Sequence, residues 1–178
     1  IRPADAASCL AIAVIVALVA VFVATTTGFP NALDEMRHYS YVAFIAETGT
    51  LAPALHEIEN LGPGPFYLNH PPGYYALMAP VFSACDGDPT CLRLANVPLG
   101  VVSALLFYAA LRRVGCRWPA ACVGTLGLHL VPFIAFMPGW INNDNLGFLA
   151  GALTVLGLSG MAGPAGRANW PLVATGVM

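Results

Sequence analysis

The apolar residues of this chain gather in four long stretches without any Asp, Glu, Lys or Arg: residues 6–27, 94–111, 118–143 and 145–166. Each stretch approaches or exceeds the ~20 residues that a helix needs to cross the hydrocarbon core of a membrane. Pro and Gly inside them are tolerated in lipid, because neighbouring helices re-satisfy the freed backbone groups. We therefore predict four transmembrane helices, at about residues 6–27, 94–111, 118–138 and 145–166, joined by a long loop over 28–93.

A secretory signal peptide is the alternative interpretation of the first stretch. Arg2 precedes the apolar run, and small residues near Ala24 form a candidate cleavage site. The run is nevertheless longer than the roughly 7 to 15 residues of a signal core, and three further spans follow it. We expect an uncleaved first helix.

The composition agrees with a membrane protein. Of 178 residues, 58% are hydrophobic and 9% are charged, whereas roughly a quarter of the residues in a soluble domain are charged. The fold class we predict is all-α, a polytopic transmembrane bundle. Because the chain starts at Ile1 and a new apolar run opens over 168–178, we expect residues 1–178 to be the N-terminal part of one larger transmembrane domain.

The arginines predict the orientation of the helices, because short cytoplasmic loops are enriched in positive charge. Five of the seven fall before the first span, between the second and third, and after the fourth: Arg2, Arg112, Arg113, Arg117 and Arg167. The loop over 28–93 and the turn at 142–145 then lie on the outer face. Eight of the nine acidic residues are on that side, so any chemistry is expected there.

Two of the five cysteines, Cys85 and Cys91, bracket a turn in the outer loop. The Asp86-Gly87 and Asp88-Pro89 pairs between them favour a tight turn, and an oxidising compartment would let the thiols bridge. We predict a disulfide, with Cα atoms within about 7 Å. Two lone cysteines are too few for a metal site, and the remaining three are expected to be reduced thiols.

The start of the outer loop predicts a helix from Asn31, as its N-cap, to a stop at Gly49. Asp34 lies in its first turn, and the side chains of Arg37 and His38 share its face at helical spacing. A first-turn carboxylate is a common helix-starting residue. It is also an ionisable group held near the bilayer, which marks a candidate functional site.

Later in the loop, His70 precedes two prolines and a segment of roughly ten apolar residues that is too short to span a membrane. We expect this segment to be an interfacial helix with Tyr74 and Tyr75 at headgroup level. His70 is then either a water-exposed interfacial residue or part of a site.

The turn between the last two spans carries three carboxamides and one carboxylate, at Asn142, Asn143, Asp144 and Asn145. One of the first three could simply cap the fourth helix. The alternative is that Asp144 contributes to a site with Asp34.

Taken in order, these motifs resemble the N-terminal part of the GT-C membrane glycosyltransferases. The resemblance rests on the first span and the segments that follow it: Asp34-Glu35 with His38-Tyr39, His70-Pro71-Pro72, Arg93-Leu94, Arg112-Arg113 and Asn142-Asn143-Asp144. The branch they resemble most includes the protein O-mannosyltransferases and the lipid A aminoarabinose transferases. Gly73 replaces a usual leucine, and Met36-Arg37 stand where one residue is usual, so the donor sugar and the acceptor stay open.

The resemblance implies an enzyme that transfers a sugar from a polyprenyl-phosphate donor to an acceptor hydroxyl by inverting displacement on the outer face. Asp34 maps to the catalytic base, Glu35 completes the acid pair, and Asp144 maps to the second-loop acid. Donor and acceptor binding would fall to Arg37, His38, His70 and Asn143. We assign no metal and no cofactor.

The partners implied are the lipid-linked donor, membrane lipid and a lipid, glycan or protein acceptor, without nucleic acid. The expected location is the bacterial inner membrane. A transporter is the first alternative, but it would place acids mid-span, whereas these spans are free of charge. A non-catalytic membrane subunit would explain the helices but not the gathering of acids and histidines on one side.

The topology predicts that residues 28–93 and 139–145 lie on one side of the membrane and residues 112–117 on the other. In otherwise cysteine-free protein in sealed vesicles, a membrane-impermeant thiol reagent should label Glu57→Cys and Arg113→Cys from opposite sides. Labelling of both from the same side would contradict this topology.

Overall fold

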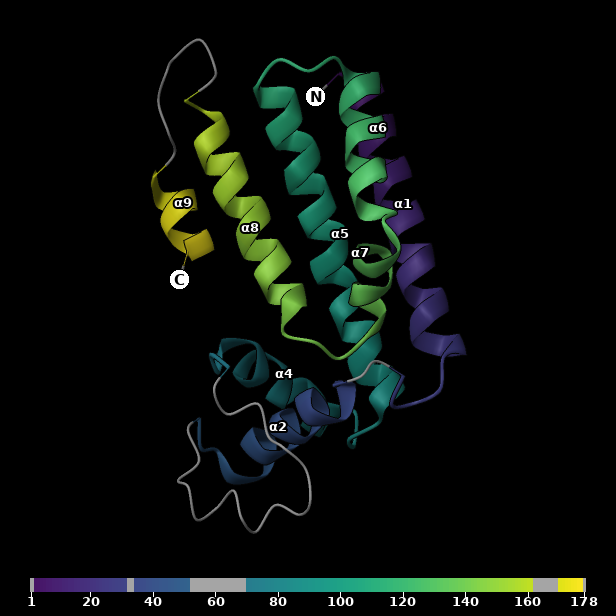
Figure 1. The fold of residues 1–178 in the computed structure, drawn as a ribbon, viewed down its shortest axis with the longest axis vertical. Helices are drawn as coiled ribbons and strands as arrows, with labels where there is room; N and C mark the ends of the chain where they lie inside the picture. Colours follow the sequence, from purple (N-terminus) through teal and green to yellow (C-terminus); the bar gives the residue numbers. More distant parts are fainter. Residues whose placement is uncertain (1, 32–33, 52–69, 162–169, 178) are drawn as a thin grey trace.

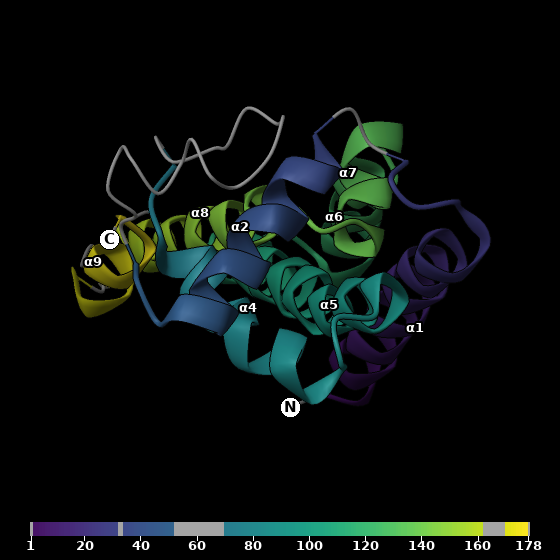
Figure 2. The ribbon, with the colours of Figure 1, turned by 90° about the horizontal axis from the view of Figure 1, so that it is seen from below.

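The computed structural model describes residues 2–31, 34–51, 70–161 and 170–177, and within these ranges every regular element is a helix. A bundle is formed by α1 (Pro3–Thr26), α5 (Pro89–Arg113), α6 (Trp118–His129) and α8 (Asp144–Ser159) (Figure 1). Consecutive helices of this bundle run in opposite directions. Across its lower end lie α2 (Glu35–Thr48) and α4 (Gly73–Ala84), which we call the cap (Figure 2). The all-α class predicted from the sequence is confirmed for this part of the chain.

Helix α1 is apolar on every side. Ile12, Val16 and Ala20 are buried against the bundle. On another face, large apolar side chains spaced four residues apart are exposed: Leu10, Val14, Leu18 and Phe22. A helix that is apolar all round belongs either in a large core or in a membrane. With 24 and 25 residues, α1 and α5 are each long and apolar enough to cross a membrane.

The third predicted span is not one continuous helix. It breaks after His129, and the chain resumes as α7 (Pro132–Phe136) and the short 3-10 helix η1 (Met137–Gly139). The axis bends by 81° at the break. Proline has no N–H to donate and its ring clashes with the preceding helical turn, while the residue before it is pushed to extended backbone. Val131, with ψ 126°, has that conformation. Pro132 therefore interrupts the continuous helix that was expected over 118–138.

The fourth predicted span is also shorter than expected. Helix α8 has 16 residues, which rise about 24 Å and fall short of a hydrocarbon core about 30 Å thick. Residues 162–166 of that prediction lie outside the described residues. Helix α9 (Trp170–Val177) packs along α8, with Gly176 against Ala150 and Thr154. The described chain therefore has two helices able to cross a membrane, or three if the bent pair is one span.

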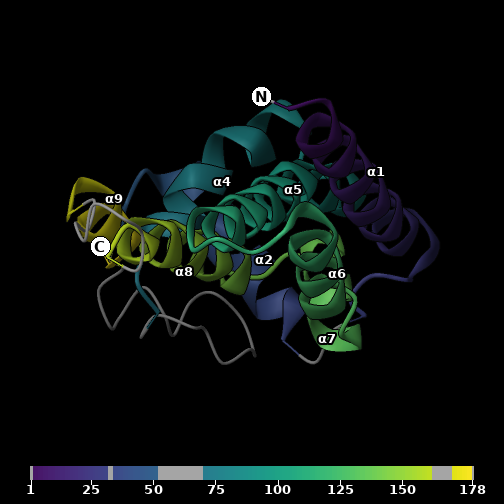
Figure 3. The ribbon, with the colours of Figure 1, turned by 90° about the horizontal axis from the view of Figure 1, so that it is seen from above.

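The two ends of the bundle carry different polar groups. At the upper end in Figure 1, Asp5 near the N-terminus accepts hydrogen bonds from Arg112 Nε at 2.6 Å and from the Tyr108 hydroxyl at 2.8 Å. These bonds join α1 to the end of α5, and Figure 3 shows α6 beside both helices. The loop over 112–117 is at this end, whereas the cap and the turn at 140–143 are at the other. Glu57, one of the two labelling positions, lies outside the described residues.

The cap has its own apolar core. It contains ten buried side chains from α2, α4, the start of α5 and the turn before α8: Tyr41, Val42, Phe44, Ile45, Tyr74, Tyr75, Met78, Ala79, Leu92 and Ile141. Tyr74 and Tyr75 are thus enclosed by the protein, with 2% and 0% exposed, and do not form the exposed interfacial pair that was expected. Both tyrosines pack against neighbouring rings, Tyr75 at 4.1 Å between its ring centroid and that of Tyr41.

The predicted disulfide is present. Cys85 and Cys91 are bridged, with their Cα atoms 5.9 Å apart. Asp86 and Gly87 adopt positive φ in the turn, a conformation in which Asp and Gly are favoured. The carboxylate of Asp88 then caps α5 by accepting the Cys91 N–H at 2.6 Å. The bridge fixes the short turn that leads from the cap into the second span.

The close approach of α5 to η1 depends on a glycine. A Cβ added at Gly100 would lie 2.5 Å from the Pro138 ring, whereas one added at Gly127 on α6 would meet nothing within 4 Å. Gly100→Ala should lower the free energy of unfolding by about 1–3 kcal/mol through overpacking, measured by thermal denaturation in detergent. Gly127→Ala is the matched control and should be no less stable than the parent. Equal stability of both variants would contradict this packing.

Candidate functional site

The cap is anchored by a buried ion pair between Glu35 on α2 and Arg93 on α5. Arg93 Nε and Nη2 donate to the two Glu35 oxygens at 2.7 and 2.6 Å. Both side chains are enclosed, with 0% of Glu35 and 1% of Arg93 exposed. Paired, parallel hydrogen bonds of this kind are among the strongest between side chains.

Both side chains of this pair make further hydrogen bonds to the backbone. Glu35 also accepts the backbone N–H of Asn31 at 2.9 Å and that of Ile141 at 3.1 Å. The Arg93 guanidinium also donates to the carbonyl oxygens of Thr27 and Gly28, at the end of α1, at 2.8 and 2.9 Å. One pair therefore joins the end of α1, the start of α2, helix α5 and the turn before α8.

The start of α2 differs from the expected one. Asp34, not Asn31, stands at the N-cap position, and no side-chain cap hydrogen bond forms there. Asn31 contributes its backbone N–H instead of its side chain, and the Glu35 carboxylate accepts this N–H. The predicted end is confirmed, since Gly49 closes the helix with φ 69°. Asp34 is consequently held at the helix start with its carboxylate uncommitted to capping.

Carboxamides fix the turn that carries Asp144. Asn96 of α5 donates to the Trp140 carbonyl at 3.1 Å, and its own oxygen accepts the Tyr74 hydroxyl at 3.1 Å. Asn145 donates to the carbonyls of Met137, Trp140 and Asn142, each at 3.1 Å. These hydrogen bonds join the turn to α4, α5 and η1. The hydrogen bond from the Ile141 N–H to the Glu35 carboxylate also fixes the turn relative to α2.

Asn142, Asn143 and Asp144, the three candidate caps, differ in position and hydrogen bonding at the start of α8. Asn142 Oδ1 accepts the Asp144 N–H at 2.8 Å, so Asn142 is the side chain that satisfies this terminus. Asn143 occupies the N-cap position without a side-chain cap bond. Asp144 is exposed in the first helical turn. Its carboxylate lies close enough to His38 to favour that ring's protonated form.

A row of polar side chains links Asp34 to His70 across the cap. His38 Nε2 lies 3.5 Å from Asp34 Oδ2, and His38 Nδ1 lies 2.8 Å from the Tyr75 hydroxyl. The same hydroxyl lies 3.1 Å from His70 Nδ1. A carboxylate only accepts, so Nε2 carries the His38 proton, Nδ1 accepts from Tyr75, and Tyr75 accepts from His70. We call these four residues the relay row.

Burial sets the protonation of His38 and Tyr75, the two middle residues of the relay row. It lowers the pKa of His38, against the opposing effect of the Asp34 carboxylate, and it raises the pKa of Tyr75. At neutral pH the imidazole of His38 is therefore uncharged and Tyr75 remains a phenol. The Asp34 side chain is 34% exposed, whereas that of His38 is 1% exposed, so solvent reaches the carboxylate but not the imidazole.

The remaining predicted residues border this row. Arg37 is half-buried on α2, one turn from Asp34, whose carbonyl accepts the Arg37 N–H at 2.9 Å. Asn143 lines a hollow of about 470 Å³ together with Pro71, Pro72 and the first residues of α4. The structure thus gathers Asp34, His38, His70 and Asp144, and it encloses Glu35 beneath them.

Sequence reasoning missed Arg93, Tyr75 and Asn96. Arg93 was taken as the last residue of the outer loop, although Asp88-Pro89 is a helix-start signal that would have placed it one turn inside α5. Tyr75 and Asn96 carry no local signal, because only the packing of α2 and α4 on α5 gives them polar partners.

Comparisons with known proteins found no matching family model, curated protein or solved structure. Among the described residues, no group of three or more His, Cys, Asp or Glu side chains is arranged to hold a metal ion.

Removal of the Glu35 charge should destabilise the fold far more than removal of another charge on the same helix. Glu35→Gln leaves the enclosed Arg93 without its counter-charge and should cost about 3–5 kcal/mol, measured by denaturation of the purified full-length protein in detergent. Glu47→Gln, at an exposed position of α2, should change stability by less than about 0.5 kcal/mol. A Glu35→Gln variant as stable as Glu47→Gln would contradict the anchoring role.

Proposed function

We propose that this protein is a membrane glycosyltransferase that moves a sugar from a polyprenyl-phosphate donor to an acceptor hydroxyl, with Asp34 as the base. The observation that supports this most is the convergence of Asp34, His38, His70 and Asp144, from segments up to 110 residues apart, at one end of an apolar bundle. The family resemblance of the sequence supports the same reaction. We infer that this end faces outward from the bacterial inner membrane.

The reaction needs one base and no general acid. The acceptor oxygen forms a bond to the anomeric carbon as the bond from that carbon to the phosphate oxygen breaks. The departing polyprenyl phosphate takes the electron pair and is a stable anion. The proton of the acceptor hydroxyl must leave in the same step, and a carboxylate within hydrogen-bond reach is suited to take it. Asp34, the partly exposed end of the relay row, fits this role.

The two acids of the Asp34-Glu35 pair then have different tasks. Glu35 is enclosed and bound to Arg93, so a substrate hydroxyl has no access to it. It acts as a positioning residue that holds the start of α2, and the proton falls to Asp34. Asp144 is the second exposed acid at the site and is suited to orient the acceptor.

Binding of the donor phosphate needs cations or hydrogen-bond donors that the donor can reach. Arg93 is excluded, because its guanidinium is enclosed and bound to Glu35 and the end of α1. Arg37 and His70 are more accessible at the same end of the bundle. His38, neutral at pH 7, can orient Asp34 but supplies no charge. The hollow lined by Asn143 is large enough to receive part of the donor or acceptor.

The alternatives are a transporter and a non-catalytic membrane subunit. A transporter would place ionisable groups near the middle of its spans. In the described parts of α1 and α5 the charged residues lie toward the helix ends, at Asp5, Arg93 and Arg112–Arg113. A subunit without catalytic function would not require an exposed carboxylate beside a buried imidazole. Both alternatives are therefore less well supported.

Asp34→Asn in the full-length protein should abolish most of the transfer activity. The carboxamide keeps the size of the side chain but cannot take a proton, and loss of a general base typically lowers the rate on the order of 100- to 10,000-fold. Activity is measured as sugar transfer from a panel of polyprenyl-phosphate sugars by the protein in lipid vesicles.

Asp86→Asn is the matched control, since Asp86 is an exposed acid of the same loop at positive φ, which Asn also adopts readily. It should retain parental turnover, and both variants should express and insert normally. If Asp34→Asn kept most of its turnover, Asp34 would be a helix-start residue only, and Asp144→Asn would be the next variant to assay.

A further inference from the structure

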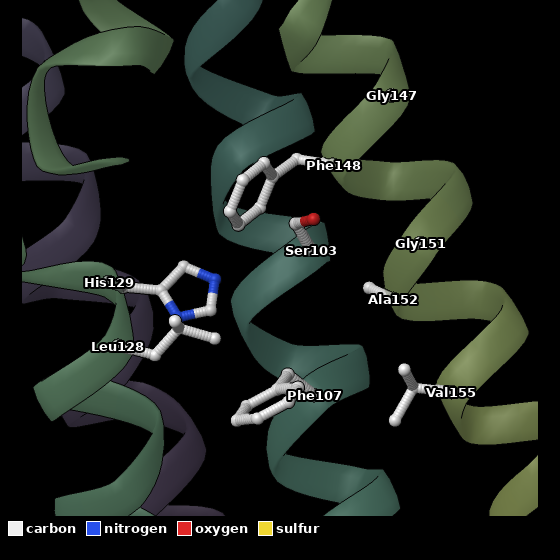
Figure 4. Close-up of a pocket in the computed structure, with 9 residues that line it drawn as sticks. All are labelled: Ser103, Phe107, Leu128, His129, Gly147, Phe148, Gly151, Ala152 and Val155. Carbon is white, nitrogen blue, oxygen red and sulfur yellow. The ribbon is translucent and has the colours of Figure 1, made fainter. Parts of the chain in front are cut away.

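A second cleft lies inside the bundle, away from the cap, between α5, α6 and α8 (Figure 4). Its volume is about 300 Å³, and most of its wall is apolar, formed in part by Phe107, Leu128, Phe148 and Val155. No charged side chain is among the described residues that line it. The proposed transfer reaction makes no use of this cleft.

Two buried polar atoms in this wall, one on each of two side chains, lack partners within the described part of the chain. Ser103 of α5 and His129 of α6 are 1% and 6% exposed. Ser103 Oγ and His129 Nε2 have no hydrogen-bond partner among the described residues. In Figure 4 the His129 imidazole points from α6 toward α5, and the Ser103 hydroxyl points from α5 toward α8. Polar groups held in an apolar setting are costly unless something supplies hydrogen bonds.

The hydrogen-bonding character of His129 follows from its other nitrogen. Nδ1 lies 2.9 Å from the carbonyl oxygen of Thr125, one turn back on α6. A carbonyl only accepts, so Nδ1 carries the proton and Nε2 of the neutral ring is an acceptor. The Ser103 hydroxyl can donate or accept. The two atoms thus offer a ligand hydroxyl an acceptor at His129 Nε2 and a donor or acceptor at Ser103 Oγ.

The cleft is open along one wall of α8. Gly147 and Gly151, one turn apart, are exposed, and a Cβ added at either would meet nothing within 4 Å. A slender chain can pass over these glycines and leave the bundle. The cleft volume is about ten times the 30 Å³ share of a water molecule in the liquid, which suits the end of an alkyl chain rather than a bulky head group.

We propose that this cleft binds the hydroxyl end of a neutral lipid alcohol, with Ser103 and His129 as its hydrogen-bonding pair. An acceptor nitrogen and the absence of lining cations disfavour a phosphate or a carboxylate. The ligand is thus chemically distinct from a polyprenyl-phosphate donor, and the proposal does not rest on the transfer reaction.

The test is photolabelling of the full-length protein in detergent with a diazirine-bearing derivative of hexadecanol, followed by peptide mapping. Labelling of α5, α6 or α8 peptides should saturate. Unlabelled hexadecanol should compete on the order of 10-fold better than hexadecyl methyl ether or palmitate, the factor expected for one net hydrogen bond. Labelling that does not saturate, or equal competition by the ether, would overturn the proposal.

Variants separate the cleft from general lipid contact. Gly151→Leu should fill the cleft and abolish saturable labelling, whereas Gly127→Leu, at an open α6 glycine that does not line the cleft, should leave it unchanged. His129→Leu should retain weaker labelling and lose the preference for the alcohol over the ether. If Gly151→Leu folds and labels like the parent, the ligand does not occupy this cleft.

Discussion

The buried pair of Glu35 and Arg93 is the interaction on which the site end of the molecule depends. Removing two charges from water is costly, and a buried pair is tolerated only when its geometry is good and its remaining hydrogen-bonding capacity is used. Here the carboxylate accepts from four donors, and the guanidinium reaches carbonyls at the end of α1. These contacts exist only if α1, α2, α5 and the turn before α8 are all in place. Breaking the pair would therefore release several segments together.

The adjacent acids Asp34 and Glu35 illustrate how this constraint shapes a site. Successive residues at a helix start point in different directions, so one carboxylate can face the protein interior while its neighbour faces outward. Glu35 fixes the backbone, and Asp34 is consequently presented beside His38 at a defined position. The relay row then connects Asp34 to α4 through Tyr75. Rigid support from a buried neighbour is what a general base requires in order to meet a substrate hydroxyl at hydrogen-bond distance.

Buried polar groups differ in whether the protein satisfies them. Glu35, Arg93 and Asn96 all have protein partners. Four buried side-chain atoms have none among the described residues: Trp140 Nε1 and Asn145 Oδ1 around the start of α8, and Ser103 Oγ and His129 Nε2 within the bundle. The bundle is also where α1 presents an exposed apolar face and two helices are long enough to cross a membrane. An unsatisfied polar group in such surroundings indicates a ligand more strongly than it would at a water-facing surface.

The sequence by itself determined the all-helical class, the two long spans, the end of α2 at Gly49 and the bridge between Cys85 and Cys91. Each of these follows from local physics: hydrophobic length, the conformational freedom of glycine, and a turn that brings two thiols together. The charge-free stretch over 118–143 did not reveal the break at Pro132, because hydropathy does not record where backbone hydrogen bonds are lost. Likewise, the charge-free stretch over 145–166 did not indicate that α8 ends at Ser159.

Only the tertiary structure decided which polar residues form the candidate site and which support it. Asp34, His38, His70 and Asp144 were candidates from their residue types and positions, but no local pattern indicated that Glu35 is enclosed while Asp34 is partly exposed. Its partner Arg93 lies 58 residues away, and Tyr75 gains its role only when α4 packs beside α2. Helices and turns depend on residues that are close in the sequence, so the sequence alone indicated them. Ion pairing and burial depend on contacts between distant segments, so only the tertiary structure could show them.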